Sequence, residues 1–208
     1  MSIDDEDLQD LLDAVRKFAE SELAPHAQER DQKKHFPVDV MQRAGELGLG
    51  GICVAERHGG AELSRAVSVR IFEELARGDT ALAAYISIHN MAVWMLDTFA
   101  REEVAAEWVP RLCSMETLGS YCLTEPDAGS DAAALRSTAR RDGDAYVLDG
   151  VSSSSRAPAL QGPTLSWPAP ATPVHTGSQH SWCRAMRRVC PSAPTSRRWA
   201  GTPSRLVR

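Results

Sequence analysis

The sequence predicts an α+β chain in which a helical domain precedes the start of a β-domain. Helical periodicity recurs through residues 3–112, extended and turn-forming segments follow up to Gly150, and periodicity stops after that glycine. We therefore expect an all-α N-terminal domain at residues 1–116 and the start of an incomplete β-domain at 117–150. A basic, low-complexity and disordered tail is expected at 151–208.

Five helices are expected in the first domain, each from the spacing of its apolar residues. They cover about residues 3–31, 37–48, 63–77, 80–99 and 101–112. Pro25 is expected to end or bend the first helix, because proline removes a backbone donor. The fourth helix is apolar nearly all round, which is typical of a buried helix.

After the fifth helix the sequence pattern changes from helical periodicity to extended and turn-forming segments. Residues 119–124 are typical of a strand, and the polar residues 125–131 of a loop. Two extended runs, 135–141 and 145–148, flank Asp-Gly-Asp and predict a β-hairpin. The β-domain therefore starts near residue 117.

The average composition hides two kinds of sequence. The 208 residues carry 23 Lys and Arg against 28 Asp and Glu, a net charge of −5, which excludes collagen-like, coiled-coil and disulfide-dense classes. Residues 1–150 hold all 28 acidic and 15 basic residues, a net −13, whereas 151–208 hold eight Arg and no Lys, Asp or Glu. That tail also contains eight Pro and ten Ser, and only seven of its 58 residues are Leu, Ile, Val or Phe. Such a segment is too poor in apolar residues to form a core.

The sequence predicts a cytoplasmic protein with no membrane association. The acidic N-terminus lacks the basic and apolar regions of a signal peptide and the basic character of a transit peptide. The chain has no apolar run approaching the roughly 20 residues that span a bilayer. Five scattered Cys do not suggest a disulfide framework.

The most informative stretch is Tyr-Cys-Leu-Thr-Glu-Pro-Asp-Ala-Gly-Ser-Asp at residues 121–131. Gly129 allows a ligand to approach the backbone closely, and Thr124 and Ser130 offer hydroxyls. Successive backbone N–H groups can also form a nest for phosphate. From the residues alone, a cofactor loop and an ordinary turn capped by Asp and Ser both remain open.

The stretch resembles the flavin-binding signature of the acyl-CoA dehydrogenases. Residues 36–48 resemble the second helix of that family, and residues 50–60 its Gly-x-Pro-Glu-x-x-Gly-Gly turn, with Ala55 in place of the usual Pro. Residues 85–94 resemble the buried helix of the isobutyryl-CoA dehydrogenase branch. The resemblance covers about residues 1–150 and implies a helical domain, a middle β-domain and a C-terminal helical domain.

The resemblance implies an FAD site and an acyl-CoA substrate, with electron-transfer flavoprotein as partner and a homo-oligomeric family assembly. It assigns six cofactor-binding residues, which are Tyr121, Cys122, Leu123, Thr124, Gly129 and Ser130. Ser130 is also assigned to the acyl-CoA. In the family, a Glu base removes the α-proton of a short or branched acyl-CoA while the β-hydride goes to flavin. That base belongs to the C-terminal domain, so no catalytic residue is assigned here, and Glu125 is expected to be structural.

The family pattern breaks after Gly150, where Val151 begins a Ser-rich run in place of Gly-x-Lys-x-Phe-Ile-Ser. We interpret the break as a shift of reading frame, since GC-rich DNA read out of frame yields Arg, Pro and Ser but few acids. Back-translation read two bases later gives a family-like sequence. Two positions in it are independent of codon choice, because Trp167-Pro168 forces Ala and Trp182-Cys183 forces Val.

Alternatives to an FAD-dependent dehydrogenase remain. The product is expected to be inactive, and could serve only as a helical fragment that packs against intact subunits. A nucleic-acid-binding tail is the weakest alternative, because its Arg residues lack regular aromatic interleaving. The spacing of His175, His180, Cys183 and Cys190 is loosely metal-like but fits no strong zinc pattern, so no metal is expected. The pair His89-Asn90 is expected either to line an acyl pocket or to be a hydrogen-bonded core pair.

Overall fold

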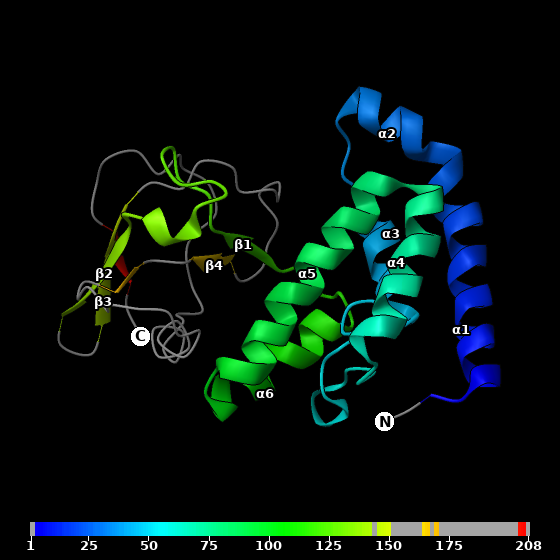
Figure 1. Ribbon diagram of the computed structural model, residues 1–208, viewed down its shortest axis with the longest axis horizontal. Helices are drawn as coiled ribbons and strands as arrows, with labels where there is room; N and C mark the ends of the chain where they lie inside the picture. Colours follow the sequence, from blue (N-terminus) through cyan, green and yellow to red (C-terminus); the bar gives the residue numbers. More distant parts are fainter. Residues whose placement is uncertain (1–2, 143–144, 151–163, 167–168, 171–203, 207–208) are drawn as a thin grey trace. The chain divides into compact units, whose positions relative to one another are not determined.

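The computed structural model describes residues 3–142, 145–150, 164–166, 169–170 and 204–206 (Figure 1). The chain divides into two compact units. The first comprises Met1–Thr98 with Glu102–Leu118, and the second comprises Phe99–Arg101 with Gly119–Arg208.

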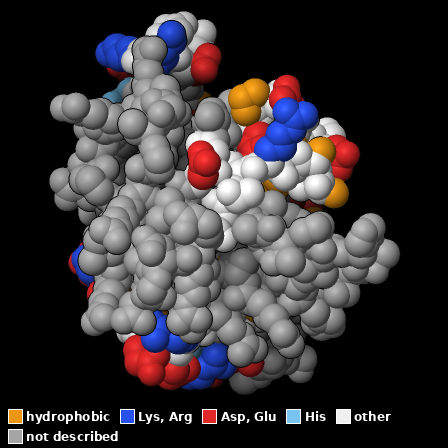
Figure 2. Space-filling model, turned by 90° about the vertical axis from the view of Figure 1, so that its left-hand side faces the viewer, with side chains coloured by type: hydrophobic (Ala, Val, Ile, Leu, Met, Phe, Trp, Pro, Cys, Tyr) orange, Lys and Arg blue, Asp and Glu red, His pale blue; other side chains and the backbone are white. Residues whose placement is uncertain are grey.

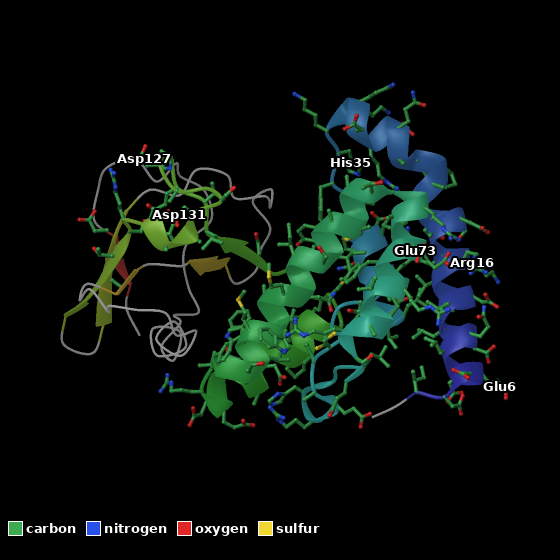
Figure 3. All side chains as sticks on the ribbon, in the orientation of Figure 1. Glu6, Arg16, His35, Glu73, Asp127 and Asp131 are labelled. Atoms are coloured by element: carbon green, nitrogen blue, oxygen red, sulfur yellow. The ribbon has the colours of Figure 1, made fainter. Side chains whose placement is uncertain are left out.

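The first unit is all-α, as predicted. Its α-helices are α1 (Asp5–Phe18), α2 (Ala27–Lys33), α3 (Val38–Glu46), α4 (Arg65–Gly78), α5 (Thr80–Phe99) and α6 (Glu102–Cys113). Asp4 caps α1 by accepting a hydrogen bond from the Asp7 N–H at 2.8 Å. Helix α1 lies alongside α4, where Arg16 donates two hydrogen bonds, 3.1 and 3.2 Å long, to the buried Glu74 (Figures 1 and 3).

The helix predicted over residues 3–31 is not continuous. A π-helical turn (η1, Ala19–Leu23) and a 3₁₀ turn (η2, Ala24–His26) separate α1 from α2. Pro25 lacks a backbone N–H, so the regular hydrogen-bond ladder cannot pass through it. The Arg30 guanidinium instead donates to the carbonyls of Glu22 and Leu23 at 2.7 and 2.9 Å. The break is thus stabilised by a side chain from the next helix.

Helix α5 supplies much of the core of the first unit. One face of this helix is buried, comprising Leu82, Ala83, Tyr85, Ile86, His89, Ala92, Val93, Met95 and Leu96. The expectation that α5 is buried all round is wrong for the other face, where Met91 is 37% exposed. Apolar character alone overestimates burial, because Ala81 and Ala84 are exposed as well.

The second unit contains short strands. After β1 (Ser120–Cys122) comes a 3₁₀ turn (η4, Ala132–Ala134), and then β2 (Thr138–Asp142) pairs antiparallel with β3 (Ala145–Asp149). This pairing matches the predicted hairpin, although β2 begins later than expected because η4 precedes it. The larger assignment of residues 117–150 to an incomplete β-domain stays a prediction.

Three pieces of the tail are described, and each is a short strand. Strand β4 (Thr164–Ser166) pairs with β1, β5 (Ala169–Pro170) with β2, and β6 (Ser204–Leu206) with β3. The disorder predicted for the rest of 151–208 lies outside the described residues. Among the described helices, none combines the length and apolar character needed to cross a bilayer.

Candidate functional site

The six predicted cofactor residues lie on β1 and on the loop that follows it. Tyr121 and Cys122 belong to β1, although their side chains are outside the described part of the structure. Leu123 and Thr124 follow the strand and are half-buried. The strand expected at residues 119–124 is therefore shorter in the structure, which leaves Leu123 and Thr124 in the segment that follows it.

A tight turn separates these residues from Gly129 and Ser130. The backbone N–H of Glu125 donates to the Ala128 carbonyl at 3.0 Å, and the Ala128 N–H donates back at 3.2 Å. Gly129 and Ser130 come next and are both exposed. A Cβ atom built on Gly129 would meet no atom within 4 Å, so packing between described residues does not require glycine here. Open space beside an exposed glycine backbone fits the close approach of a phosphate group.

The loop is anchored by the carboxylate of Glu125, which is 7% exposed. It accepts hydrogen bonds from the backbone N–H groups of Arg136 at 2.7 Å and Ser137 at 2.8 Å. Burial alone raises the pKa of Glu125, but the Ser137 side chain, these backbone donors and the Arg136 charge outweigh it and hold the pKa below its ordinary value. An ionised carboxylate that accepts two hydrogen bonds suits an anchor better than a general base.

The outer side of the loop is charged. Asp127 and Asp131 both lie on this loop (Figure 3), and Asp127 pairs with Arg136 at 3.0 Å in an exposed ion pair. Asp131 accepts a hydrogen bond from the Ala133 N–H at 3.1 Å and so begins η4. Acidic and basic side chains also lie close together on the face drawn in Figure 2. Exposed pairs of this kind stabilise a fold only weakly.

A shallow hollow of about 480 Å³ lies beside the anchor. Its described lining is made of Glu125–Asp127, Arg136–Thr138, Asp149 and Gly150. The described residues that line it do not include Leu123, Thr124, Gly129 or Ser130. The hollow is therefore distinct from the surface that the cofactor motif predicts.

The pair His89-Asn90 is part of the core of the first unit. The Asn90 Oδ1 accepts from the Ile52 N–H at 2.8 Å, and its Nδ2 donates to the Leu49 and Ile86 carbonyls at 2.7 and 3.0 Å. The fully buried His89 donates from Nε2 to the Leu112 carbonyl at 2.9 Å. These contacts support a hydrogen-bonded core pair over an acyl-pocket lining.

Other predicted features lie elsewhere. The described residues hold no group of three or more His, Cys, Asp or Glu side chains able to bind a metal ion. The four tail residues with loosely metal-like spacing, His175, His180, Cys183 and Cys190, fall outside the described residues. Sequence reasoning missed the partners of Glu125, because residues 136 and 137 lie beyond the recognisable motif.

The helical unit and the loop after β1 define a class of protein. The sequence model of the family domain named acyl-CoA dehydrogenase, N-terminal domain, matches residues 5–116. The chain therefore belongs to the acyl-CoA dehydrogenase family. The chain is 53% identical to the mitochondrial isobutyryl-CoA dehydrogenase of Bos taurus over 133 residues, covering 64% of this chain and 32% of that protein. It is also 36% identical to the glutaryl-CoA dehydrogenase of Desulfococcus multivorans over 148 residues, 69% of this chain and 38% of that protein. The chain thus spans about a third of the length of these relatives.

Solved structures show the same fold. A glutaryl-CoA dehydrogenase in complex with glutaryl-CoA superposes with a TM-score of 0.69 at 33% identity, over 74% of this chain and 40% of that one. The glutaryl-CoA dehydrogenase of Mycobacterium smegmatis in complex with FADH2 gives 0.76 at 27% identity, over 81% of this chain and 44% of that one. Family members therefore bind FAD and acyl-CoA.

Proposed function

We propose that these residues form part of an FAD-dependent dehydrogenase for short or branched acyl-CoA thioesters and supply one wall of its flavin site. The observation that carries the proposal is the exposed glycine of the loop after β1. Gly129 has free space where a side chain would be, in a loop held by the buried Glu125. The 53% identity to an isobutyryl-CoA dehydrogenase supports a branched substrate.

The residues of this chain have separate tasks in the proposal. Tyr121, Cys122, Leu123 and Thr124 would contact the flavin ring, where hydrogen-bond donors favour its anionic reduced form. Backbone N–H groups at Gly129 and Ser130 would face the pyrophosphate, with Ser130 also touching acyl-CoA. Bound FAD would supply the hydride acceptor for the β-carbon.

The 208 residues by themselves are expected to be catalytically inactive. Removing an α-proton needs a base within reach of the substrate. Both oxygens of Glu125, the carboxylate of the cofactor motif, accept backbone hydrogen bonds. The chain would thus contribute to flavin binding without completing the reaction.

Acyl-CoA and electron-transfer flavoprotein are the proposed partners, within a homo-oligomer. A solved structure of the electron-transferring flavoprotein of Acidaminococcus fermentans is also similar to this chain, with a TM-score of 0.67 at 32% identity. The cytoplasmic location stays a prediction, and the isobutyryl-CoA dehydrogenases of Bos taurus and Dictyostelium discoideum are described as mitochondrial.

Titration with FAD tests the flavin site. Quenching of FAD fluorescence by the purified chain measures its FAD affinity, which we expect to fall at least tenfold in Gly129→Ala. The unfolding midpoint of this variant should match that of wild type, because the added methyl meets no atom within 4 Å. Ala133→Ser adds one heavy atom to an exposed position of the same loop and is the matched control. Equal FAD affinity in all three proteins would refute the assignment of Gly129.

A second candidate is a non-catalytic helical fragment that packs against intact subunits. The observation in its favour is that large apolar side chains of the helical unit are exposed, among them Val38, Leu47, Val69 and Met91. A colourless chain that co-elutes with a full-length family member would support this candidate. A chain that stays monomeric beside that protein would count against it.

A further inference from the structure

The imidazole of His58 lies between two carboxylates in the first unit. The ring is 5% exposed and ends the 3₁₀ turn η3 (Glu56–His58). Its Nδ1 lies 2.7 Å from Asp97 Oδ1 on α5, and its Nε2 lies 3.3 Å from Glu102 Oε1, at the first residue of α6. One ring therefore connects a surface turn to two helices.

The two contacts differ in their surroundings. The Asp97 side chain is 9% exposed and also accepts from the Ala55 N–H at 3.4 Å and from Arg57 Nη2 at 3.3 Å. The Glu102 side chain is 76% exposed. Burial, with a further contribution from the Asp97 charge, raises the pKa of the Cys113 thiol on α6 to about 12. Among the described contacts, the ring thus meets the carboxylates of Asp97 and Glu102, and Arg57 pairs with Asp97.

The number of protons on the ring decides which contacts can exist together. An ionised carboxylate only accepts hydrogen bonds, whereas a neutral imidazole has a single N–H. Both contacts are therefore satisfied only by the doubly protonated ring. A neutral ring would keep its N–H on the short, buried Asp97 side and leave Nε2, an acceptor, opposite the Glu102 carboxylate.

We propose that His58 is a proton-dependent latch that joins the η3 turn to the first turn of α6. When the ring is doubly protonated, the latch is closed, because Nδ1 donates to Asp97 on α5 and Nε2 donates to Glu102 on α6. Loss of the Nε2 proton releases Glu102 while Asp97 still holds the ring. The first turn of α6 and the η3 turn then move independently.

Three backbone amides report the state of the latch. Within and after η3, the N–H groups of His58, Gly59 and Gly60 donate to the carbonyls of Ala55 or Glu56 at 2.9 to 3.2 Å. Opening of the turn exposes these amides to hydrogen exchange. Amides in the middle of α4, such as Ile71, report global unfolding instead, because Ile71 is fully buried.

Hydrogen exchange of the full chain at about pH 5.5 and about pH 8.5, corrected for intrinsic rates, tests the latch. We expect protection of the three amides to fall about twofold to fivefold at the higher pH, as suits one exposed charged contact, without a change at Ile71. In Glu102→Gln the amide accepts from the protonated ring or donates to the neutral one, so protection should not depend on pH. In Glu102→Ala it should be low at both values.

Equal protection of the wild-type turn at both pH values would overturn the latch. So would a Glu102→Gln variant that keeps the wild-type pH dependence, or a Glu102→Ala variant that keeps wild-type protection at low pH. Glu102 is exposed, so both variants should fold.

Discussion

The side-chain oxygen of Asn90 accepts a hydrogen bond from the backbone N–H of Ile52 at 2.8 Å, and so joins α5 to the segment that follows α3. Its amide nitrogen donates to two further backbone carbonyls, those of Leu49 and Ile86. The Ile52 side chain is itself 1% exposed. One polar side chain therefore satisfies three backbone groups.

Replacing Asn90 by Leu should lower the free energy of unfolding by about 2–4 kcal/mol, because the backbone groups of Leu49 and Ile52 lose their partner. The matched control is Ser87→Ala on the same helix, which loses a single bond to the Ala84 carbonyl. It should cost about 1 kcal/mol or less. Urea unfolding followed by circular dichroism measures both, and equal effects would contradict the role of Asn90.

Arg30 offers a second test, at the break between α1 and α2. Its side chain is 10% exposed and donates to the carbonyls of Glu22 and Leu23. Its Nη1 also lies 3.8 Å from Asp79 Oδ2. Asp79 in turn caps the start of α5 by accepting from the N–H groups of Ala81 and Leu82. Arg30→Met should destabilise the chain by about 2–4 kcal/mol, because it leaves Asp79 without its cation and two carbonyls without a donor.

The control for Arg30 is Lys33→Met. Lys33 pairs with the exposed Glu29 on the same helix at 2.6 Å, so its loss should cost under about 1 kcal/mol. Thermal unfolding at fixed pH separates the two variants. An Arg30→Met protein as stable as Lys33→Met would show that the break does not depend on this guanidinium.

Glu125 makes the anchor of the candidate flavin loop sensitive to acid. Its pKa is lowered in the folded chain, so its contribution to stability is present above the unfolded pKa and is lost as pH falls through the folded pKa. Exchange protection of the Arg136 and Ser137 amides should therefore fall as pH drops below about 4, the ordinary range of carboxyl groups. In Glu125→Gln that protection should be lower at neutral pH and independent of acid. A wild-type loop with unchanged protection at low pH would contradict the anchor.

The tail has its own test, which is the sequence of the gene. We expect the DNA downstream of codon 151 to encode a family-like strand pair in another frame, because residues 151–208 lack Asp, Glu and Lys altogether. A chain expressed from the corrected frame should bind FAD more tightly than the present one. An intact single frame with no shifted homology would refute the interpretation.

Local sequence patterns predicted much of the helical unit. Apolar spacing located α3 to α6 within a few residues, since each of these helices buries one face of regularly spaced side chains. The break at Ala19–His26 was predicted only as an effect of Pro25. The rescue of its carbonyls by Arg30 could not be predicted, because that contact depends on tertiary packing.

The candidate site was predicted in part. The motif placed Gly129 and Ser130 on the loop after a strand, whereas Leu123 and Thr124 were expected on the strand itself and instead follow β1. It did not indicate that the backbone of residues 136 and 137 donates to Glu125. Nor did it reveal the two carboxylates around His58, since Asp97 and Glu102 are about forty residues away in sequence. Long-range polar contacts leave no periodic signal in one sequence.

Activity of the isolated chain tests the central claim most directly. With saturating FAD and isobutyryl-CoA, the purified 208-residue chain should reduce an electron-accepting dye no faster than buffer. Proton removal needs a free base, and both oxygens of Glu125 already accept backbone hydrogen bonds. A full-length isobutyryl-CoA dehydrogenase serves as the positive control. Isobutyryl-CoA-dependent turnover by the isolated chain would contradict the account.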